Sequence, residues 1–152
     1  MSNGKATTIK KVFSRQTSVR IDINADTAIV WALLTNASDF ARWNSTIVFI
    51  KGNIALGEKI ELKAKIDEKR TFKIKIKEFT PEKHMRWGDA MGNRDFTLTP
   101  NADGGLTFSM SEKIGGPIFP LFAGMLPSFD EAFEQYAADL KREAELIFNS
   151  KN

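Results

Sequence analysis

The chain has 152 residues, a length typical of one domain that buries a core without disulfides or metals. Its net charge of +3 is too small to indicate nucleic-acid binding, which usually requires a larger and clustered excess. Cysteine is absent and His84 is the single histidine, so disulfides and a thiol nucleophile are excluded and a structural zinc site is disfavoured. We expect neither a metal nor a cofactor.

The first segment, residues 1–14, is polar and basic, and we expect it to be frayed or to extend the edge of a sheet. It lacks the apolar region of a secretory signal. No stretch of the chain approaches the roughly 20 apolar residues that a membrane-spanning helix needs. We therefore expect a cytoplasmic protein without stable membrane insertion.

A strand and two helices are predicted next. Apolar residues alternate in "TSVRIDIN", residues 17–24, which indicates a strand with one buried face: Val19, Ile21 and Ile23. The following stretch, "NADTAIVWALLTNA", predicts a helix that Asn24 or Asp26 could cap. Its buried stripe consists of Val30, Leu33 and Leu34. "SDFARW" predicts a second short helix with Ser38 as its cap.

Six further strands are predicted over 46–52, 59–66, 70–79, 84–87, 94–100 and 106–114. The connections between them are short, including turns at "DEK" (67–69) and "TPEK" (80–83), which is typical of antiparallel hairpins. In the second of these strands, one face carries Ile60, Leu62, Ala64 and Ile66. The phase of "TIVFIKG", residues 46–52, is not evident because the run is apolar throughout.

Lysines alternate with apolar residues in "RTFKIKIKEF", residues 70–79. Binding of single-stranded nucleic acid would require aromatic residues on the same face as the lysines, for base stacking. Phe72, which directly precedes Lys73, points to the opposite face together with Ile74 and Ile76. We therefore interpret the lysine face as a solvated sheet surface: Lys73, Lys75 and Lys77.

The C-terminal part begins with "GGPIFPLFAGMLP", residues 115–127, whose prolines prevent a regular helix. This segment could pack the end of the sheet, or form an apolar flap at the mouth of a cavity, or do both. Apolar residues then recur at helical spacing from Phe129 to Ile147, which predicts one long amphipathic helix. Ser128 and Glu131 have the spacing of a capping box at its start.

The order of elements is a strand, two helices, six strands and one long helix, and that helix must cover the dry face of the sheet. The chain resembles the START-type helix-grip superfamily, in its bacterial polyketide cyclase/dehydrase-like (SRPBCC) branch. The resemblance is carried by "IDINADTAIVWALLTNASDFARWN", "GNIALGEKI", "RDFTLTPNADGG", "SEKIGGP" and "FEQYAADLKREAE". It implies an α+β fold, in which a curved antiparallel sheet of about seven strands wraps around the C-terminal helix of a single domain. Many relatives carry His two residues before the hairpin Phe, where this chain has Arg94.

Counting outward from the "NADGG" turn pairs Arg94 with Glu112 on the inner face of the sheet, and the preceding hairpin places Trp87 beside Arg94. An isolated charge on that face would be costly, so the two side chains should pair. The pair could hold the polar group of a ligand, or it could be a structural salt bridge near the end of the sheet. His84 is predicted on the outer face as an ordinary surface residue. Asp89 and Asp95 are predicted in or beside a loop, with hydrogen-bonding roles.

These observations favour a binding module that holds a small hydrophobic or amphipathic, lipid- or polyketide-like molecule between the sheet and the C-terminal helix, in a monomer. One alternative is a cyclase, dehydratase or hydrolase that acts through Glu112 and Arg94. Another is a protein-interaction module of the co-chaperone kind that uses the outer face of the sheet. The predicted ligand-binding residues are Trp43, Leu62, Ile74, Ile76, Trp87, Arg94, Phe96, Phe108, Met110, Glu112, Phe119, Phe122, Met125, Phe129, Phe133 and Tyr136.

Overall fold

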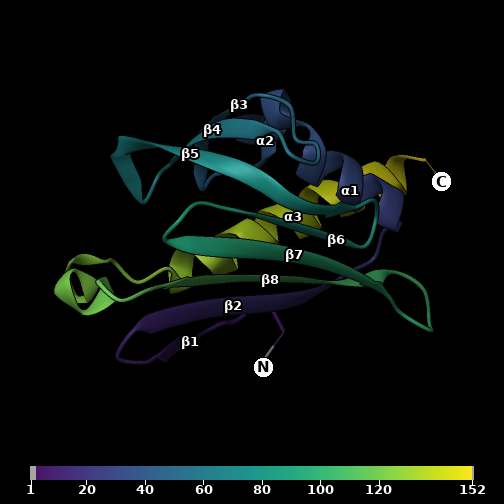
Figure 1. Ribbon diagram of the computed structural model, residues 1–152. Coiled ribbons are helices and arrows are strands. Elements are labelled where there is room, and N and C mark those ends of the chain that lie inside the picture. The colour runs from purple at the N-terminus through teal and green to yellow at the C-terminus, as the bar shows by residue number, and fades with distance from the viewer. Residues whose placement is uncertain (1–2, 152) are drawn as a thin grey trace.

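The computed structural model describes residues 3–151. Its strands form one antiparallel sheet in the order β1-β2-β8-β7-β6-β5-β4-β3, and the long helix α3 (Asp130–Ser150) covers one face of that sheet (Figure 1). The α+β fold with a curved, open sheet around one long helix is therefore confirmed. The strands are Ala6–Lys10 (β1), Ser14–Ile23 (β2), Ile47–Lys51 (β3), Lys59–Ala64 (β4), Asp67–Thr80 (β5), His84–Gly88 (β6), Gly92–Pro100 (β7) and Leu106–Gly115 (β8).

The eighth strand, one more than expected, lies in the basic N-terminal segment. β1 pairs with β2 along its whole length and forms one edge of the sheet. Helix α3 secures this edge, because Glu134 accepts a hydrogen bond from the backbone N–H of Ala6 at 2.9 Å. The edge extension was thus the correct alternative for residues 6–10. Residues 1 and 2 of that segment lie outside the described part of the chain.

Two strand boundaries differ from the sequence-based prediction. The turn before β5 lies at residues 65–66, so "DEK" is not a turn: β5 starts at Asp67 and the hairpin is longer than expected. β3 contains a register shift between Ile47 and Phe49, so its buried side chains, Ile47 and Ile50, are three residues apart rather than two. The shift explains why no alternation is visible in this stretch of sequence.

The two helices between β2 and β3 are α1 (Thr27–Thr35) and α2 (Phe40–Trp43), joined by the 3₁₀ turn Ala37–Asp39. Asp26 occupies the N-cap position of α1 without forming a side-chain capping bond. The predicted cap at Ser38 is wrong, because Ser38 lies inside the 3₁₀ turn and Asp39 precedes α2. Both helices contact α3.

Helix α3 begins two residues after Ser128, and Phe129 occupies its N-cap position. The predicted capping box is therefore wrong: Ser128 lies one residue too early, and its Oγ accepts a bond from the backbone N–H of Asp130 at 3.3 Å. The buried stripe of α3 contains the expected apolar residues and one acid, Asp139. Asp139 accepts 2.7 Å bonds from the backbone N–H and Oγ of Ser45, which fixes α3 to the loop after α2.

The hairpin β7–β8 has the register counted from the sequence: Leu98 pairs with Phe108, Phe96 with Met110, and Arg94 with Glu112. β6 adds Trp87 opposite Arg94. These residues share the face toward α3, which positions them for the site described below. In the described residues, no helix is long and apolar enough to cross a bilayer.

Candidate functional site

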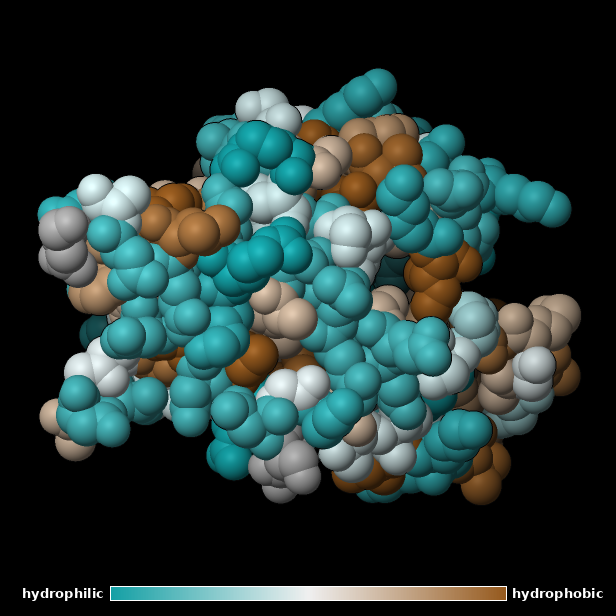
Figure 2. Space-filling view, turned by 180° about the vertical axis from the view of Figure 1, so that it is seen from behind, coloured by the Kyte–Doolittle hydropathy of each residue, from teal (hydrophilic) through white to brown (hydrophobic). Residues whose placement is uncertain are grey.

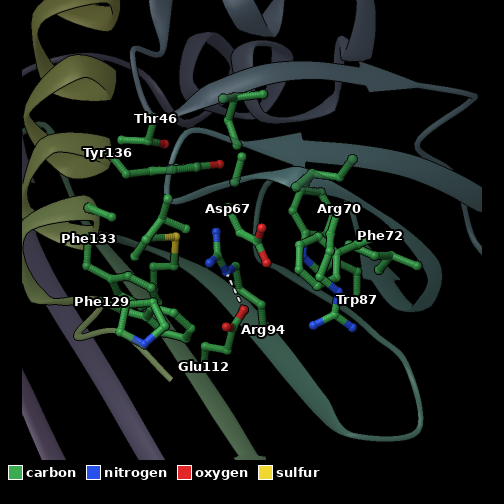
Figure 3. Close-up of a pocket in the computed structure, with 18 of the residues that line it drawn as sticks. Thr46, Asp67, Arg70, Phe72, Trp87, Arg94, Glu112, Phe129, Phe133 and Tyr136 are labelled. Carbon is green, nitrogen blue, oxygen red and sulfur yellow. Dashed lines mark hydrogen bonds and ion pairs between the residues drawn. The ribbon is translucent and has the colours of Figure 1, made fainter. Parts of the chain in front are cut away.

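A cavity of about 160 Å³ lies between the sheet and the first turns of α3. Figure 3 shows its wall, to which α3, the β4–β5 hairpin and the inner face of β6–β8 all contribute. Its mouth lies between the turn that joins β4 to β5 and the end of segment 116–127, and Figure 2 shows the surface hollowed there. The space exists because small side chains, Ala64 and Ala132, face it from the sheet and the helix.

A neighbouring region of the same interface is filled. Phe96 and Phe108 are fully buried, and the Phe108 ring stacks on Tyr136 with centroids 6.3 Å apart. On the inner face of β7 and β8, the pair next to Phe96 and Met110 is Arg94 and Glu112, so charged side chains follow the large apolar ones. The cavity therefore begins where the inner face of the sheet becomes polar.

Arg94 and Glu112 form a partly buried ion pair, in which Nε of Arg94 donates to Oε1 of Glu112 at 2.9 Å. The guanidinium of Arg94 also lies 4.9 Å from the ring centroid of Phe133 and 5.9 Å from that of Tyr136. Contacts between a cation and aromatic rings are attractive, and they hold the guanidinium against α3. Arg94 thus bridges the sheet and the helix at the cavity wall (Figure 3).

Tyr136 is buried, and its hydroxyl has no hydrogen-bond partner within residues 3–151. Burial raises the pKa of this phenol well above its ordinary value, while the nearby charge of Arg94 lowers it by a smaller amount. Figure 3 shows the Tyr136 ring reaching from α3 into the space between helix and sheet, with its oxygen directed away from the helix. The wall therefore contains a neutral hydroxyl beside the charged pair.

A smaller cavity of about 110 Å³ lies next to the first, under the β6–β7 turn. Ile74, Trp87, Arg94 and Glu112 line both cavities. The row of Trp87, Arg94 and Glu112 is therefore a shared wall, and movement of one of these side chains would change the size of both spaces.

The structure brings together the following sequence-predicted residues around the larger cavity: Leu62, Ile74, Trp87, Arg94, Met110, Glu112, Phe129, Phe133 and Tyr136. The other predicted residues lie elsewhere. Ile76, Phe96 and Phe108 lie on the inner face of the sheet but beyond the end of the cavity, and they pack in the filled core together with Trp43 of α2. Within segment 116–127, Phe119 is buried, Phe122 packs on Phe119, and Met125 is exposed.

Several cavity residues were not predicted. The alternation of β5 had placed Phe72 on the inner face with Ile74, but Phe72 was not named among the ligand-binding residues. Asp67 was missed because it was assigned to a turn, and Arg70, the first residue of the predicted strand 70–79, was not considered as a cavity residue. Leu126 and Pro127, which belong to the predicted flap, line the mouth; the segment thus both packs the end of the sheet and borders the cavity.

Arg15 is a buried arginine that contacts Phe129, a residue of the cavity wall. Its side chain is 6% exposed, its guanidinium lies 4.6 Å from the ring centroid of Phe129, and its Nη2 has no hydrogen-bond partner. None of the described carboxylates forms an ion pair with it. Arg15 was not noticed in the sequence, because one arginine before an alternating strand carries no signal of burial.

The outer face of the same strands carries a charge cluster of Glu78, His84, Arg86 and Asp95. Nε2 of His84 and Nε of Arg86 lie 2.8 and 2.9 Å from Oδ1 of Asp95, and Glu78 pairs with Arg86 at 2.7 Å. Asp95 lies within β7, as the predicted strand 94–100 implies, and Asp89 lies in the β6–β7 turn, where it accepts bonds from the backbone N–H of Met91 and Gly92. The pKa of Arg86 is raised because Asp95 and Glu78 favour its charged form.

The model of the family "Polyketide cyclase / dehydrase and lipid transport" matches residues 14–145. The chain belongs to this family. No curated protein matches its sequence.

Solved structures of low sequence identity share the fold of this family member. A protein from Mesorhizobium loti is 19% identical, with a TM-score of 0.65 over 84% of this chain and 95% of its own. A START superfamily protein from Mycobacterium smegmatis is 13% identical, with a TM-score of 0.63 over 87% and 98%. A protein of the dynemicin biosynthetic locus is 19% identical, with a TM-score of 0.60 over 86% of this chain and 47% of its own.

In this member of the family, the acidic residues and His84 do not assemble into a metal site. Residues 3–151 contain no cluster of three or more His, Asp or Glu side chains that could hold a metal ion. The polar groups on the cavity wall are Arg94, Glu112 and Tyr136, together with Thr46, Asp67 and Arg70. They offer charged and neutral hydrogen bonding beside an apolar space.

Proposed function

We propose that the chain binds a small amphipathic molecule in the cavity between the sheet and α3. The observation that carries this proposal is a mostly apolar cavity with an arginine, a glutamate and a buried hydroxyl on its wall. Ligand sites of proteins have this composition: an apolar lining and a few polar groups that fix orientation. The family description, which includes polyketide cyclases and lipid transport, supports the same class of ligand.

The volume limits what enters without rearrangement. A cavity of about 150 Å³ accommodates benzene, so about 160 Å³ suits a single ring or a short acyl chain. Larger ligands require displacement of Leu126 and Pro127 at the mouth or of Arg94 at the shared wall.

The polar wall favours a neutral polar group over a carboxylate. Arg94 can donate to a ligand oxygen, whereas Glu112 can accept from a ligand O–H or N–H. A hydroxyl or an amide satisfies both, whereas a carboxylate would lie close to the negative charge of Glu112. We therefore expect phenols, enols or amides to bind better than acids of the same size.

Single-ring probes test the proposal: toluene, benzyl alcohol, benzamide and benzoate, titrated by ligand-observed NMR. Benzyl alcohol and benzamide should bind most tightly to the parent protein. Arg94→Met with Glu112→Leu should lose this preference and favour toluene. The matched control is Arg86→Met with Asp95→Leu on the outer face of the same strands, which should bind all four probes as the parent does.

A second test fills the space. Ala132→Leu places a larger side chain on the cavity wall, whereas Ala138→Leu adds the same volume at an exposed position of α3. Loss of probe binding in the first variant and retention in the second are expected. Equal affinity in both variants would show that the probes bind elsewhere and would contradict the proposal. Native mass spectrometry of the protein purified from its own source would then reveal the mass of the natural ligand.

A further inference from the structure

One end of the molecule exposes large apolar side chains from two segments distant in sequence. In segment 116–127, Leu121 and Met125 are 82% and 78% exposed, and Ile118 is also exposed. In the β1–β2 turn, Val12 and Phe13 are exposed as well. Single exposed apolar residues are common, but a group of them on one side marks an interaction site.

The two segments are in contact, so these side chains form one surface. The backbone N–H of Gly116 donates to the carbonyl of Phe13 at 3.0 Å. Figure 1 shows the β1–β2 turn, segment 116–127 and the β4–β5 turn at the same end of the sheet. We call this surface the apolar end; it consists of Val12, Phe13, Ile118, Leu121 and Met125.

The exposure of Leu121 and Met125 is built into the local fold. Phe119 is buried and its ring packs on Phe122 with centroids 5.4 Å apart, which fixes the segment to the body of the molecule. Leu121 and Met125 end the two 3₁₀ turns of this segment, Phe119–Leu121 and Ala123–Met125, and both side chains are exposed. The apolar end is thus a shaped surface, held by its own aromatic contact.

Basic side chains surround the apolar end. Lys10 and Lys11 flank the β1–β2 turn, Lys113 precedes segment 116–127, and Lys65 and Lys69 border the β4–β5 turn; all are exposed. None of them forms an ion pair with another residue between 3 and 151. The exposed acids near these lysines are Glu68 in β5 and Glu131 in the first turn of α3. Apolar side chains within a ring of unpaired cations match the interface of an anionic bilayer.

The mouth of the cavity opens at the same end. Leu126 and Pro127, which directly follow Met125 of the apolar end, line the cavity on one side, and Ile66 and Arg70 of the β4–β5 hairpin line it on the other. A ligand that leaves an apolar phase there would enter the cavity without crossing water.

We infer that the apolar end docks on an anionic membrane surface, with Leu121 and Met125 inserted among the lipids and the lysines near the head groups. A second copy of the chain fits this surface less well, because it would bring two sets of unpaired lysines together. The inference goes beyond ligand binding, since docking does not require an occupied cavity. It concerns peripheral contact and not insertion of a helix.

Vesicle flotation tests the inference with phosphatidylcholine vesicles, alone or mixed with phosphatidylglycerol. The parent protein should bind the anionic vesicles and release them at high salt. Leu121→Ser with Met125→Ser should weaken binding by about tenfold or more, because the inserted apolar area is lost. Leu56→Ser with Leu146→Ser is the matched control, since both residues are exposed leucines outside the apolar end. This control should bind as the parent does.

Two double variants compare the contribution of lysines at the apolar end to vesicle binding with that of lysines elsewhere. Lys11→Gln with Lys113→Gln should weaken binding to the anionic vesicles and reduce its dependence on salt, whereas Lys73→Gln with Lys75→Gln on the outer sheet face should not. Absence of binding by the parent, or equal binding by each variant and its control, would overturn the inference. A dimer in sedimentation that dissociates in the Leu121→Ser, Met125→Ser variant would also overturn it, in favour of a second copy.

Failure of docking and failure of ligand binding are distinguishable. The Leu121→Ser, Met125→Ser variant should still bind benzyl alcohol in solution. The Arg94→Met, Glu112→Leu variant should lose its preference for that probe and still bind anionic vesicles.

Discussion

Two arginine–carboxylate pairs lie back to back on β6–β8. Arg94 and Glu112 face α3, whereas Arg86 and Asp95 face outward from neighbouring positions of the same strands. In both pairs the arginine Nε donates to the carboxylate at 2.9 Å. The surroundings differ: the inner side chains are 17% and 20% exposed, and the outer ones 40% and 27%.

The comparison shows that bond length alone does not set the energetic importance of an ion pair. The outer pair retains contact with water and shares its carboxylate with His84, so loss of one partner leaves a charge that solvent can stabilise. The inner pair lies against Phe133 and Tyr136, where an orphan charge has little solvent to replace the lost partner. The difference comes from the face of the sheet on which each pair lies. Adjacent residues of a strand lie on opposite faces.

The largest expected effect is therefore on the inner pair. Arg94→Met or Glu112→Leu should each lower the free energy of unfolding by about 2–4 kcal/mol, between the values for exposed and fully buried pairs. The double variant should recover much of this loss, because it leaves no unpaired charge. Denaturant unfolding of the four proteins measures the effect. Neutral single variants would show that the pair is solvated and that the contrast with the outer face is wrong.

The next effect concerns Tyr136, whose pKa is raised mainly by burial. The unfolded chain ionises this phenol near pH 10 and the folded chain does not, so the contribution is complete below about pH 10 and is lost as the pH rises above it. Stability should fall by about 1 kcal/mol more in the parent than in Tyr136→Phe between about pH 10 and pH 11.

The chain contains a single tyrosine, so tyrosinate absorbance reports on this group alone. In the parent, that absorbance should appear together with unfolding. Its appearance near pH 10 in the folded protein would show that the hydroxyl reaches solvent. Because Arg94→Met destabilises the fold, the absorbance of that variant should appear with unfolding at a lower pH than in the parent, whereas Arg86→Met should change it little.

A smaller effect is expected at the outer pair. Arg86→Gln or Asp95→Asn should cost about 0–1 kcal/mol of unfolding free energy, as measured for exposed ion pairs. A double-mutant cycle at low and high salt isolates the interaction, which should decrease with salt. A coupling energy as large as that of the inner pair would remove the distinction between the two faces.

The smallest effect is expected on the lysine face of β5. Lys73→Ser, Lys75→Ser and Lys77→Ser together should change stability by less than about 1 kcal/mol and leave probe binding intact, since the three side chains are exposed. Lys77 should account for most of any change, because its Nζ bonds to the carbonyl of Asp89 and to Oδ1 of Asn93. A gel shift with nucleic acid that disappears in this variant would contradict the interpretation of this face as a solvated surface.

The sequence predicted the β7–β8 register correctly because "NADGG" restricts where the hairpin can turn, and side-chain alternation then places Arg94 opposite Glu112. It predicted the strand β3 but not its buried face, because the register shift breaks the alternation, and it missed the start of β5, where "DEK" resembles a turn. The buried Asp139 could not be predicted, since its partner Ser45 is distant in sequence. Contact with a ligand stays a prediction for every residue of the cavity wall.

The pairing of β2 with β8 has a consequence for synthesis of the chain. Ser14 pairs with Gly115, so the first long strand, β2, lacks its partner β8 until nearly all other strands have been synthesised. Helix α3 follows later still, and without it Trp87, Phe96 and Phe108 have no cover. A nascent chain therefore exposes one face of an unfinished sheet for most of its synthesis. We expect folding to be largely post-translational, with dependence on chaperones during that interval.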